Sequence, residues 1–252
     1  MTIGWKRIVA AGWTALAMTT ARAAWAAEAP ALRWGLPERV STYGAQIDHL
    51  FYIILAITGA VFVLVEVVLL VFLIRYRQRP GRQATYTHGD TRVEIIWTII
   101  PTIIMVWLAL GSQQLWAQVR SPRHFPTGAT EIEVTAEQFA WNFRYPGPDG
   151  RFDTADDITT INQLHLPVNQ PVVVRLKSKD VIHSFFLPQF RLKQDAVPGM
   201  TGLLWLQATR TGHWEIACAE LCGLGHYLMK GFITVEEPAA LAQWLADTKA
   251  AE

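Results

Sequence analysis

Two long apolar runs in the first half of the chain give way to short alternating segments in the second half. Residues 50–74 are almost wholly apolar, with Glu66 as the single carboxylate, and residues 93–112 form a second apolar run. Each run is long enough to cross the hydrocarbon core of a bilayer as an α-helix. We therefore predict a transmembrane hairpin over residues 28–112, with Glu66 protonated and facing a neighbouring subunit.

The segment that joins the two apolar runs orients the hairpin. It carries one acid, Asp90, and five arginines, at positions 75, 77, 79, 82 and 92. Because positively charged loops stay in the cytoplasm, both outer ends of the hairpin are expected on the opposite side. Residues 1–27 resemble a secretory signal, with Lys6 and Arg7 before a short apolar core and small residues after it. The alternative is an uncleaved amphipathic N-terminus.

Beyond a polar linker, predicted over residues 113–130, the pattern is typical of strands. Residues 131–135 alternate polar and apolar side chains, residues 139–145 alternate with aromatic side chains on one side, and residues 171–176 are rich in valine. Short strands with turn residues between them indicate an antiparallel sandwich or small barrel. We predict an all-β domain over residues 131–236 and an amphipathic helix over residues 237–252, hence an α+β membrane protein.

Composition and charge agree with this division. The chain of 252 residues is 51% hydrophobic and 17% charged, which is too apolar for an ordinary soluble domain. Residues 1–130 carry 12 basic and 6 acidic side chains (+6), and residues 131–252 carry 10 and 15 (−5), which gives the net charge of +1. The acidic half is expected to attract a basic protein partner, and no nucleic acid is expected.

Both cysteines lie in one stretch, Cys218 and Cys222, followed at once by His226 and Met229. A disulfide there would close a very small loop, zinc is rarely completed by methionine, and a thioredoxin-like redox pair has two intervening residues. Thiolate, imidazole and thioether together favour copper. A further ligand is then needed, and His183, which follows a valine-rich strand among apolar residues, is the candidate.

The chain resembles subunit II of the haem-copper cytochrome c oxidases over nearly its whole length. The resemblance rests on the two-helix hairpin, on residues 183–185 (His-Ser-Phe), on residues 193–199 (Lys-Gln-Asp-Ala-Val-Pro-Gly) and on residues 218–229. It implies a cupredoxin-type Greek-key barrel that holds a binuclear copper centre, CuA. The implied ligands are His183, Cys218, the backbone carbonyl of Glu220, Cys222, His226 and Met229.

The same resemblance implies roles for three further groups. Trp141 matches the exposed aromatic residue through which electrons enter from cytochrome c, although an aromatic side chain of the barrel core is the structural alternative. Glu94 matches the entrance of a proton pathway, in competition with a carboxylate that stabilises the start of the helix. The side chain of Glu220 matches a magnesium ligand at the boundary with subunit I. Met200 departs from the family, which commonly has arginine there.

The implied function is that of the electron-transfer subunit of a respiratory terminal oxidase. It would accept electrons from cytochrome c, or from a haem c subunit, and pass them to the haem-copper subunit I, which reduces oxygen to water; subunit III is a further expected partner. The implied location is the inner membrane of a bacterial cell, with the copper domain on the periplasmic side. The alternatives are a subunit of a haem-copper nitric oxide reductase and a membrane-anchored copper-delivery protein.

Overall fold

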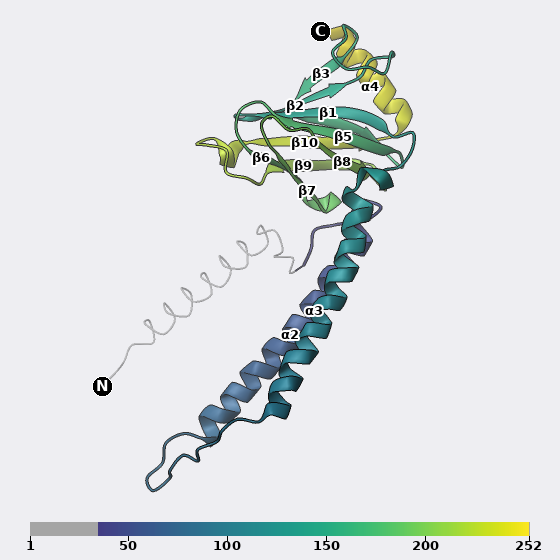
Figure 1. The fold of residues 1–252 in the computed structure, drawn as a ribbon. Coiled ribbons are helices and arrows are strands. Elements are labelled where there is room, and N and C mark those ends of the chain that lie inside the picture. Colours follow the sequence, from purple (N-terminus) through teal and green to yellow (C-terminus); the bar gives the residue numbers. More distant parts are fainter. Residues whose placement is uncertain (1–34, 252) are drawn as a thin grey trace, which may run out of the picture. The chain divides into compact units, whose positions relative to one another are not determined.

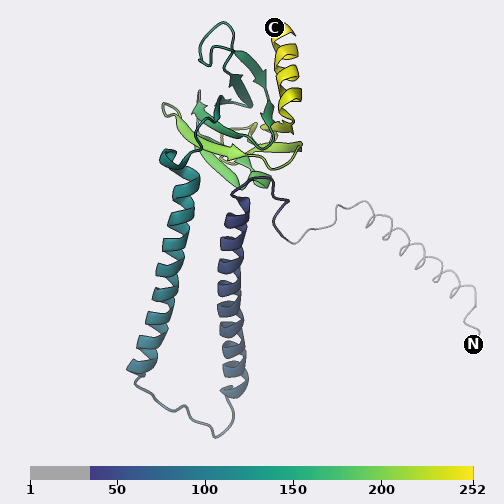
Figure 2. The same cartoon turned by 90° about the vertical axis from the view of Figure 1, so that its right-hand side faces the viewer.

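Two long helices dominate the first part of the structure, a computed structural model that describes residues 35–251. Helix α2 spans Gly44–Arg75 and helix α3 spans Thr91–Arg120. Figures 1 and 2 show them running antiparallel to each other, joined by residues 76–90. Both are long and apolar enough to cross a membrane, which confirms the predicted hairpin. The predicted signal, residues 1–27, lies outside the described residues.

Both helices are longer than predicted: α2 begins at Gly44, before residue 50, and α3 continues beyond residue 112 to Arg120. The start of the predicted linker, residues 113–120, is therefore helical. Those residues include Gln, Leu, Ala and Arg, which favour helix, and their polar character marks only the exit from the membrane. Val119 is buried against the β-domain, so tertiary packing also stabilises this last part of α3.

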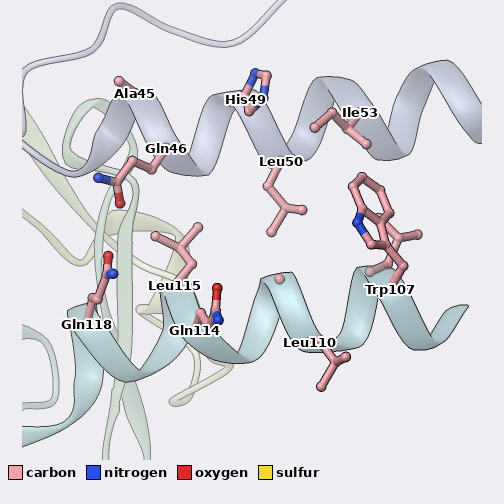
Figure 3. A pocket seen from close by; sticks show the side chains of 12 residues that line it. Ala45, Gln46, His49, Leu50, Ile53, Trp107, Leu110, Gln114, Leu115 and Gln118 are labelled. Carbon is pink, nitrogen blue, oxygen red and sulfur yellow. The ribbon is translucent and has the colours of Figure 1, made fainter. Parts of the chain in front are cut away.

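A cleft of about 740 Å³ lies between the outer halves of the two helices (Figure 3). Leu50 and Ile53 of α2 face Trp107 and Leu115 of α3 across it. The side chains along most of both helices are exposed in the isolated chain. Apolar side chains in a membrane pack against lipid or against other helices. The hairpin therefore offers a large apolar surface to neighbours in the membrane.

The outer ends of the helices are fastened to the β-domain. The Tyr43 ring, just before α2, packs edge-on against Trp205 with 5.2 Å between ring centroids. The Arg191 guanidinium donates to both carboxylate oxygens of Asp48, at 2.6 and 3.2 Å. At the end of α3, Arg120 donates to Gln194 Oε1 at 2.7 Å. These contacts define the side of the β-domain that faces the membrane.

The β-domain contains two five-stranded sheets. The first has the order β3-β2-β1-β5-β8, with β3 Ile158–Ile161, β2 Ala140–Tyr145, β1 Thr130–Glu137, β5 Pro171–Ser178 and β8 Gly202–Gln207. The second has the order β4-β10-β9-β6-β7, with β4 Gln163–Pro167, β10 Lys230–Glu236, β9 Gly212–Cys218, β6 His183–Leu187 and β7 Leu192–Ala196. Short 3₁₀ turns cover Pro122–His124, Pro188–Phe190 and His226–Leu228.

The core of the domain is built from the alternating side chains of these strands. Trp141, Phe143 and Tyr145 of β2 are buried, while the residues between them are partly exposed. The all-β domain is thus confirmed, with one difference from the prediction. Two of its strand pairs, β1 with β5 and β4 with β10, are parallel, because the crossing connections of a cupredoxin-like sandwich place sequence-distant strands side by side.

Helix α4, Pro238–Ala251, corresponds to the predicted C-terminal helix, and its Trp244 and Leu245 pack against the core of the β-domain. The indole of Trp244 stacks on the imidazole of His165, with centroids 3.6 Å apart and planes 8° apart. Lys249 Nζ donates to the carbonyl oxygens of Ala155 and Asp157 at 3.0 and 2.9 Å. The first contact joins the helix to β4, and the second joins it to the hairpin that connects β2 with β3.

Candidate metal centre

The two ends of the cysteine-containing loop are neighbours in the second sheet. Strand β9 ends at Cys218, β10 begins at Lys230, and the two strands pair in antiparallel register. The Cys218 amide donates to the Met229 carbonyl at 3.3 Å, which closes the loop over residues 218–229. Strand β9 pairs with β10 on one side and with β6 on the other. His183, at the start of β6, therefore lies beside the same loop.

The donor atoms predicted from the sequence converge in pairs. The two cysteine Sγ atoms are 3.8 Å apart. Cys218 Sγ lies 3.9 Å from His183 Nδ1 and 3.3 Å from the Glu220 carbonyl oxygen. Cys222 Sγ lies 3.7 Å from His226 Nδ1 and 3.8 Å from Met229 Sδ. Each sulfur atom therefore has one imidazole and one weaker donor beside it, and the two groups meet at the pair of sulfurs.

These separations fit donors that share a metal ion. With metal–sulfur bonds of about 2.3 Å and metal–nitrogen bonds of about 2.0–2.1 Å, neighbouring donors on a tetrahedral ion lie about 3.5–3.8 Å apart. Donor atoms of His183, Cys218 and Cys222 all lie within 4.8 Å of one another. A set that combines thiolate, thioether and imidazole is soft and suits copper. The residues present therefore fit a copper centre.

Burial and hydrogen bonding fix the orientation of His183. Its side chain is fully buried, and its Nε2 atom lies 2.9 Å from Asp180 Oδ1. Since a carboxylate only accepts, Nε2 carries the proton and Nδ1 is left as the acceptor that faces Cys218. Burial alone would raise the pKa of Asp180, but hydrogen bonds from His183 and from the Gln138 and Val181 amides hold that pKa below its usual value.

The thiol of Cys222 is more enclosed than that of Cys218. Cys222 and Met229 are buried at 4% and 2% exposure. Burial raises the pKa of Cys222, and the neighbouring Cys218 raises it further. The metal-free thiol is therefore protonated at neutral pH, and a metal ion must displace that proton in order to bind.

Two family models match the chain. The transmembrane domain of cytochrome c oxidase subunit II matches residues 30–115, and the periplasmic domain of the same subunit matches residues 149–236. The alternative cytochrome c oxidase subunit 2 of Bradyrhizobium diazoefficiens is 35% identical over 239 residues, which covers 86% of this chain and 84% of the relative. The chain belongs to the cytochrome c oxidase subunit II family.

Other members of the subunit II family are comparably similar. Cytochrome c oxidase subunit 2 of Thermostichus vulcanus is 29% identical over 267 residues, covering 85% of this chain and 79% of the relative. The crystal structure of the periplasmic domain of subunit II from Bradyrhizobium japonicum has 30% identity and a TM-score of 0.45, and covers 50% of this chain and 97% of that chain.

Family membership confirms the main functional predictions. The chain is the electron-transfer subunit of a haem-copper oxidase, an oxidoreductase complex, and the nitric oxide reductase and copper-delivery alternatives are not favoured. It is a two-pass membrane protein with an outer-side domain. The family implies copper binding, a complex with subunit I and a cytochrome c donor.

Trp141 does not occupy the exposed position that the subunit II resemblance implied. Its side chain is completely buried in the barrel core. The indole packs edge-on against Phe185 at 5.3 Å and lies 6.2 Å from the ring of His183. The expectation of an exposed Trp141 is wrong, because the alternation of β2 directs this side chain between the two sheets.

A different aromatic residue reaches the surface beside the cysteine-containing loop over residues 218–229. Phe139 lies in the turn between β1 and β2 and is 39% exposed. A Cβ atom added to Gly225 would come within 2.5 Å of its ring, so the loop backbone rests directly on Phe139. Next to it, Gln138 Nε2 donates to the Cys222 carbonyl. Sequence reasoning missed Phe139, because residues 139–145 were predicted as one strand and no glycine, proline, asparagine or aspartate marks a turn before Phe139.

The two glutamates with predicted roles are both at the surface. Glu220 is exposed while its carbonyl oxygen faces Cys218, so its side chain is available outside the loop. Glu94 is exposed in the first turn of α3. The N-cap of that helix is Asp90, whose carboxylate accepts from the Arg92 amide at 2.9 Å. Glu94 is therefore not the N-cap residue. Its carboxylate can still stabilise the start of α3 through the helix dipole.

Proposed function

We propose that His183 and the loop over residues 218–229 hold a binuclear copper centre, CuA, which relays electrons singly from cytochrome c to subunit I. The observation that carries this proposal is the two-sided donor set. The cysteine sulfurs lie 3.8 Å apart, and each has its own imidazole at 3.7–3.9 Å. Two copper ions would be held by the two thiolates and the two imidazoles, with the Glu220 carbonyl and the Met229 thioether as weaker donors.

The residues of the chain supply a rigid frame for this chemistry. Bound copper would supply a soft one-electron couple that needs no bond-making. His183 is held by Asp180, and Met229 is held in the core by burial and by its amide hydrogen bonds to the Gly225 and His226 carbonyls. Because these donors have little freedom to move, the ligand positions change little between redox states. Small rearrangement of this kind favours fast electron transfer.

Phe139 is the proposed point of electron entry in place of Trp141. It is the aromatic side chain in the described structure that both reaches solvent and lies under the ligand-bearing loop. Its neighbour Gln138 connects the same turn to the Cys222 carbonyl and, through its amide, to Asp180 Oδ2 at 2.7 Å. Contacts therefore run without a break from this surface to both halves of the donor set.

Replacing Phe139 with leucine should slow electron entry without loss of copper. Leucine keeps an apolar side chain under the loop but removes the aromatic ring edge. We expect the rate of copper reduction by cytochrome c to fall about tenfold, an added barrier of about 1.4 kcal/mol. Stopped-flow absorbance would measure it, with Phe152→Leu in the β2–β3 hairpin as a matched control. An unchanged rate in Phe139→Leu would remove this role.

Two further residue roles, a location and a further partner also follow from the resemblance and are proposed here. The exposed carboxylate of Glu220 is proposed as a magnesium ligand at the boundary with subunit I. Glu94, at the cytoplasmic start of α3, is proposed as the entrance of a proton pathway. The complex is proposed to lie in a bacterial inner membrane, with the β-domain on the periplasmic side and with subunit III as a further partner.

Copper loading of the full chain in detergent tests the proposed centre. With both thiols reduced, we expect two copper ions per chain and a mixed-valence electron paramagnetic resonance spectrum in which the two ions are equivalent. Metal analysis and the spectrum are measured on the same sample. A single copper per chain, or uptake of zinc alone, contradicts the proposal.

A further inference from the structure

We infer that the cleft between α2 and α3 binds one zwitterionic phospholipid of the outer leaflet. One acyl chain of the lipid lies in the apolar part of the cleft. The phosphate and ester oxygens of the same lipid accept hydrogen bonds from side chains at the rim of the cleft. This site lies in the membrane hairpin and is independent of the proposed copper centre.

The lining of the cleft changes from polar to apolar along the two helices (Figure 3). The end next to the β-domain carries amide and imidazole groups, from Gln46, His49, Gln114 and Gln118. The deeper part is lined by apolar side chains, from Leu50, Ile53, Trp107, Leu108 and Leu110. A ligand that matches this gradient has a polar head, which points toward the β-domain, and a hydrocarbon tail.

The depth of the cleft matches one leaflet of a bilayer. With a rise of about 1.5 Å per residue, the lining extends about 12 Å along α2, from Ala45 to Ile53, and about 17 Å along α3, from Gln118 to Trp107. One leaflet provides about half of the hydrocarbon core, which is about 30 Å thick. A lipid chain ends near the middle of the bilayer, whereas a membrane helix of another subunit crosses the whole core. The limited depth therefore favours a lipid.

The polar rim lies at the depth of the lipid headgroups. Its four residues all lie outside the apolar runs over residues 50–74 and 93–112, and therefore in the interfacial layer. Side-chain amides and a neutral imidazole can donate hydrogen bonds to phosphate and ester oxygens. Among the described residues, those that line the cleft include no lysine or arginine, whereas sites for anionic lipids are rich in both. The rim therefore fits a zwitterionic headgroup.

The size of the cleft also suits a hydrocarbon chain. Its volume of about 740 Å³ lies within the range of about 300–1,000 Å³ that is usual for small-molecule sites. Leu50, Ile53 and Leu108 are only partly exposed, unlike most side chains of the two helices, because they face the cleft. An apolar gap between them forfeits dispersion contacts, and an acyl chain that fills the gap restores those contacts.

The cleft adjoins the attachment of the hairpin to the β-domain. The Gln118 carbonyl accepts a hydrogen bond from Trp205 Nε1 at 3.4 Å. Leu115, which lines the cleft, also packs against the core of the β-domain. A lipid in the cleft therefore holds α2 and α3 at a fixed spacing directly below these contacts.

Native mass spectrometry of the full chain in a mild detergent tests the lipid site. The probe is dioleoyl phosphatidylethanolamine, titrated into delipidated protein. Dioleoyl phosphatidylglycerol, which has the same acyl chains and an anionic headgroup, is the comparison lipid. We expect one phosphatidylethanolamine per chain to be retained. The affinity for phosphatidylglycerol should be at most about threefold higher, because the lining supplies no lysine or arginine.

Two glycines of the hairpin provide a matched pair of variants. Gly111 lines the cleft, and a Cβ atom added to it meets no atom within 4 Å, so Gly111→Phe fills the cleft without a clash. We expect this variant to lower the lipid affinity at least about tenfold. Gly59 has equally open surroundings but does not line the cleft. Gly59→Phe is therefore the control, and its lipid affinity should equal that of the wild type.

A rim variant tests the headgroup contacts separately. Gln118→Leu removes a side-chain donor but keeps the backbone carbonyl that bonds to Trp205. It should lower the affinity for phosphatidylethanolamine about threefold to tenfold, the usual effect of losing one hydrogen bond. An unchanged affinity in both Gly111→Phe and Gln118→Leu would overturn the lipid site, as would a wild-type chain that retains no phosphatidylethanolamine.

Two further results would assign the cleft to a different occupant. A preference of about tenfold or more for phosphatidylglycerol would show that an anionic headgroup is selected, against the proposal. The assembled oxidase provides the other result. If Gly111→Phe kept the wild-type lipid affinity but prevented assembly with subunit I, and Gly59→Phe did not, the cleft would hold a helix of subunit I and the lipid site would be overturned.

Discussion

Cys222→Ser is expected to abolish the metal centre while leaving the fold intact. Cys222 Sγ lies at the middle of the donor set, within 3.7–3.8 Å of donor atoms from Cys218, His226 and Met229. A hydroxyl oxygen is a hard and weak donor for copper. Removing a residue that only hydrogen-bonds to a metal ligand typically lowers metal affinity about 10–100-fold. Removing Cys222, which lies beside three other donors, should therefore lower copper affinity by more than about 100-fold.

The measurements for Cys222→Ser are copper per chain, the mixed-valence spectrum and electron transfer from cytochrome c in the assembled complex. Serine is close to cysteine in size, so the thermal unfolding of the metal-free protein should change little. His213→Ala is the control, because His213 lies on the same strand, β9, but bonds to Thr234 Oγ1 and not to the sulfur atoms. Two bound coppers with an unaltered spectrum in Cys222→Ser would contradict the bridging role.

Trp141→Ala is expected to destabilise the β-domain by about 3–5 kcal/mol, the usual cost of truncating a fully buried large aromatic side chain. The indole fills the core between the sheets and packs against Phe185 and near His183. A cavity at that place also loosens the wall behind the His183 ring, so copper content should fall as well. Chemical denaturation of the copper-free and copper-loaded protein would measure both effects.

Trp141→Phe provides the matched control, because it keeps an aromatic ring in the core and should lose much less stability than Trp141→Ala. The experiment also separates the two roles that the sequence left open for this residue. If Trp141→Ala kept wild-type stability and copper content but received electrons slowly, Trp141 would be the entry residue despite its burial. Loss of stability and copper together supports the packing role.

The convergence of the proposed copper-binding side chains could be predicted because their chemistry is unusual for their spacing. Two cysteines, a histidine and a methionine within a dozen residues have few explanations other than a soft metal, and the position of His183 followed from the need for one more ligand. What the sequence could not supply was the pairing of the donors. The assignment of His183 to Cys218 and of His226 to Cys222 depends on how β6, β9 and β10 lie side by side.

The misplacement of Trp141 has a clear physical origin. Residues 139, 141, 143 and 145 share one parity, so alternation alone assigns Phe139 and Trp141 to the same face. Strand β2 begins only at Ala140, however, and Phe139 belongs to the turn before it. Within β2, alternation directs the Trp141 side chain into the core. Phe139 precedes the strand, so alternation does not apply to it and its side chain reaches the surface. Strand ends are set by tertiary pairing, which a single sequence shows poorly.

The helical course of residues 113–120 changes how the copper site is supported. With a flexible linker, the distance between the β-domain and the membrane would vary. Helix α3 instead continues to Arg120, whose guanidinium bonds directly to β7. The rate of electron tunnelling falls steeply with distance. The continuous helix α3 therefore fixes the distance between the proposed copper centre and the electron acceptor in subunit I. Inserting glycines into it should therefore slow onward transfer even where every ligand is intact.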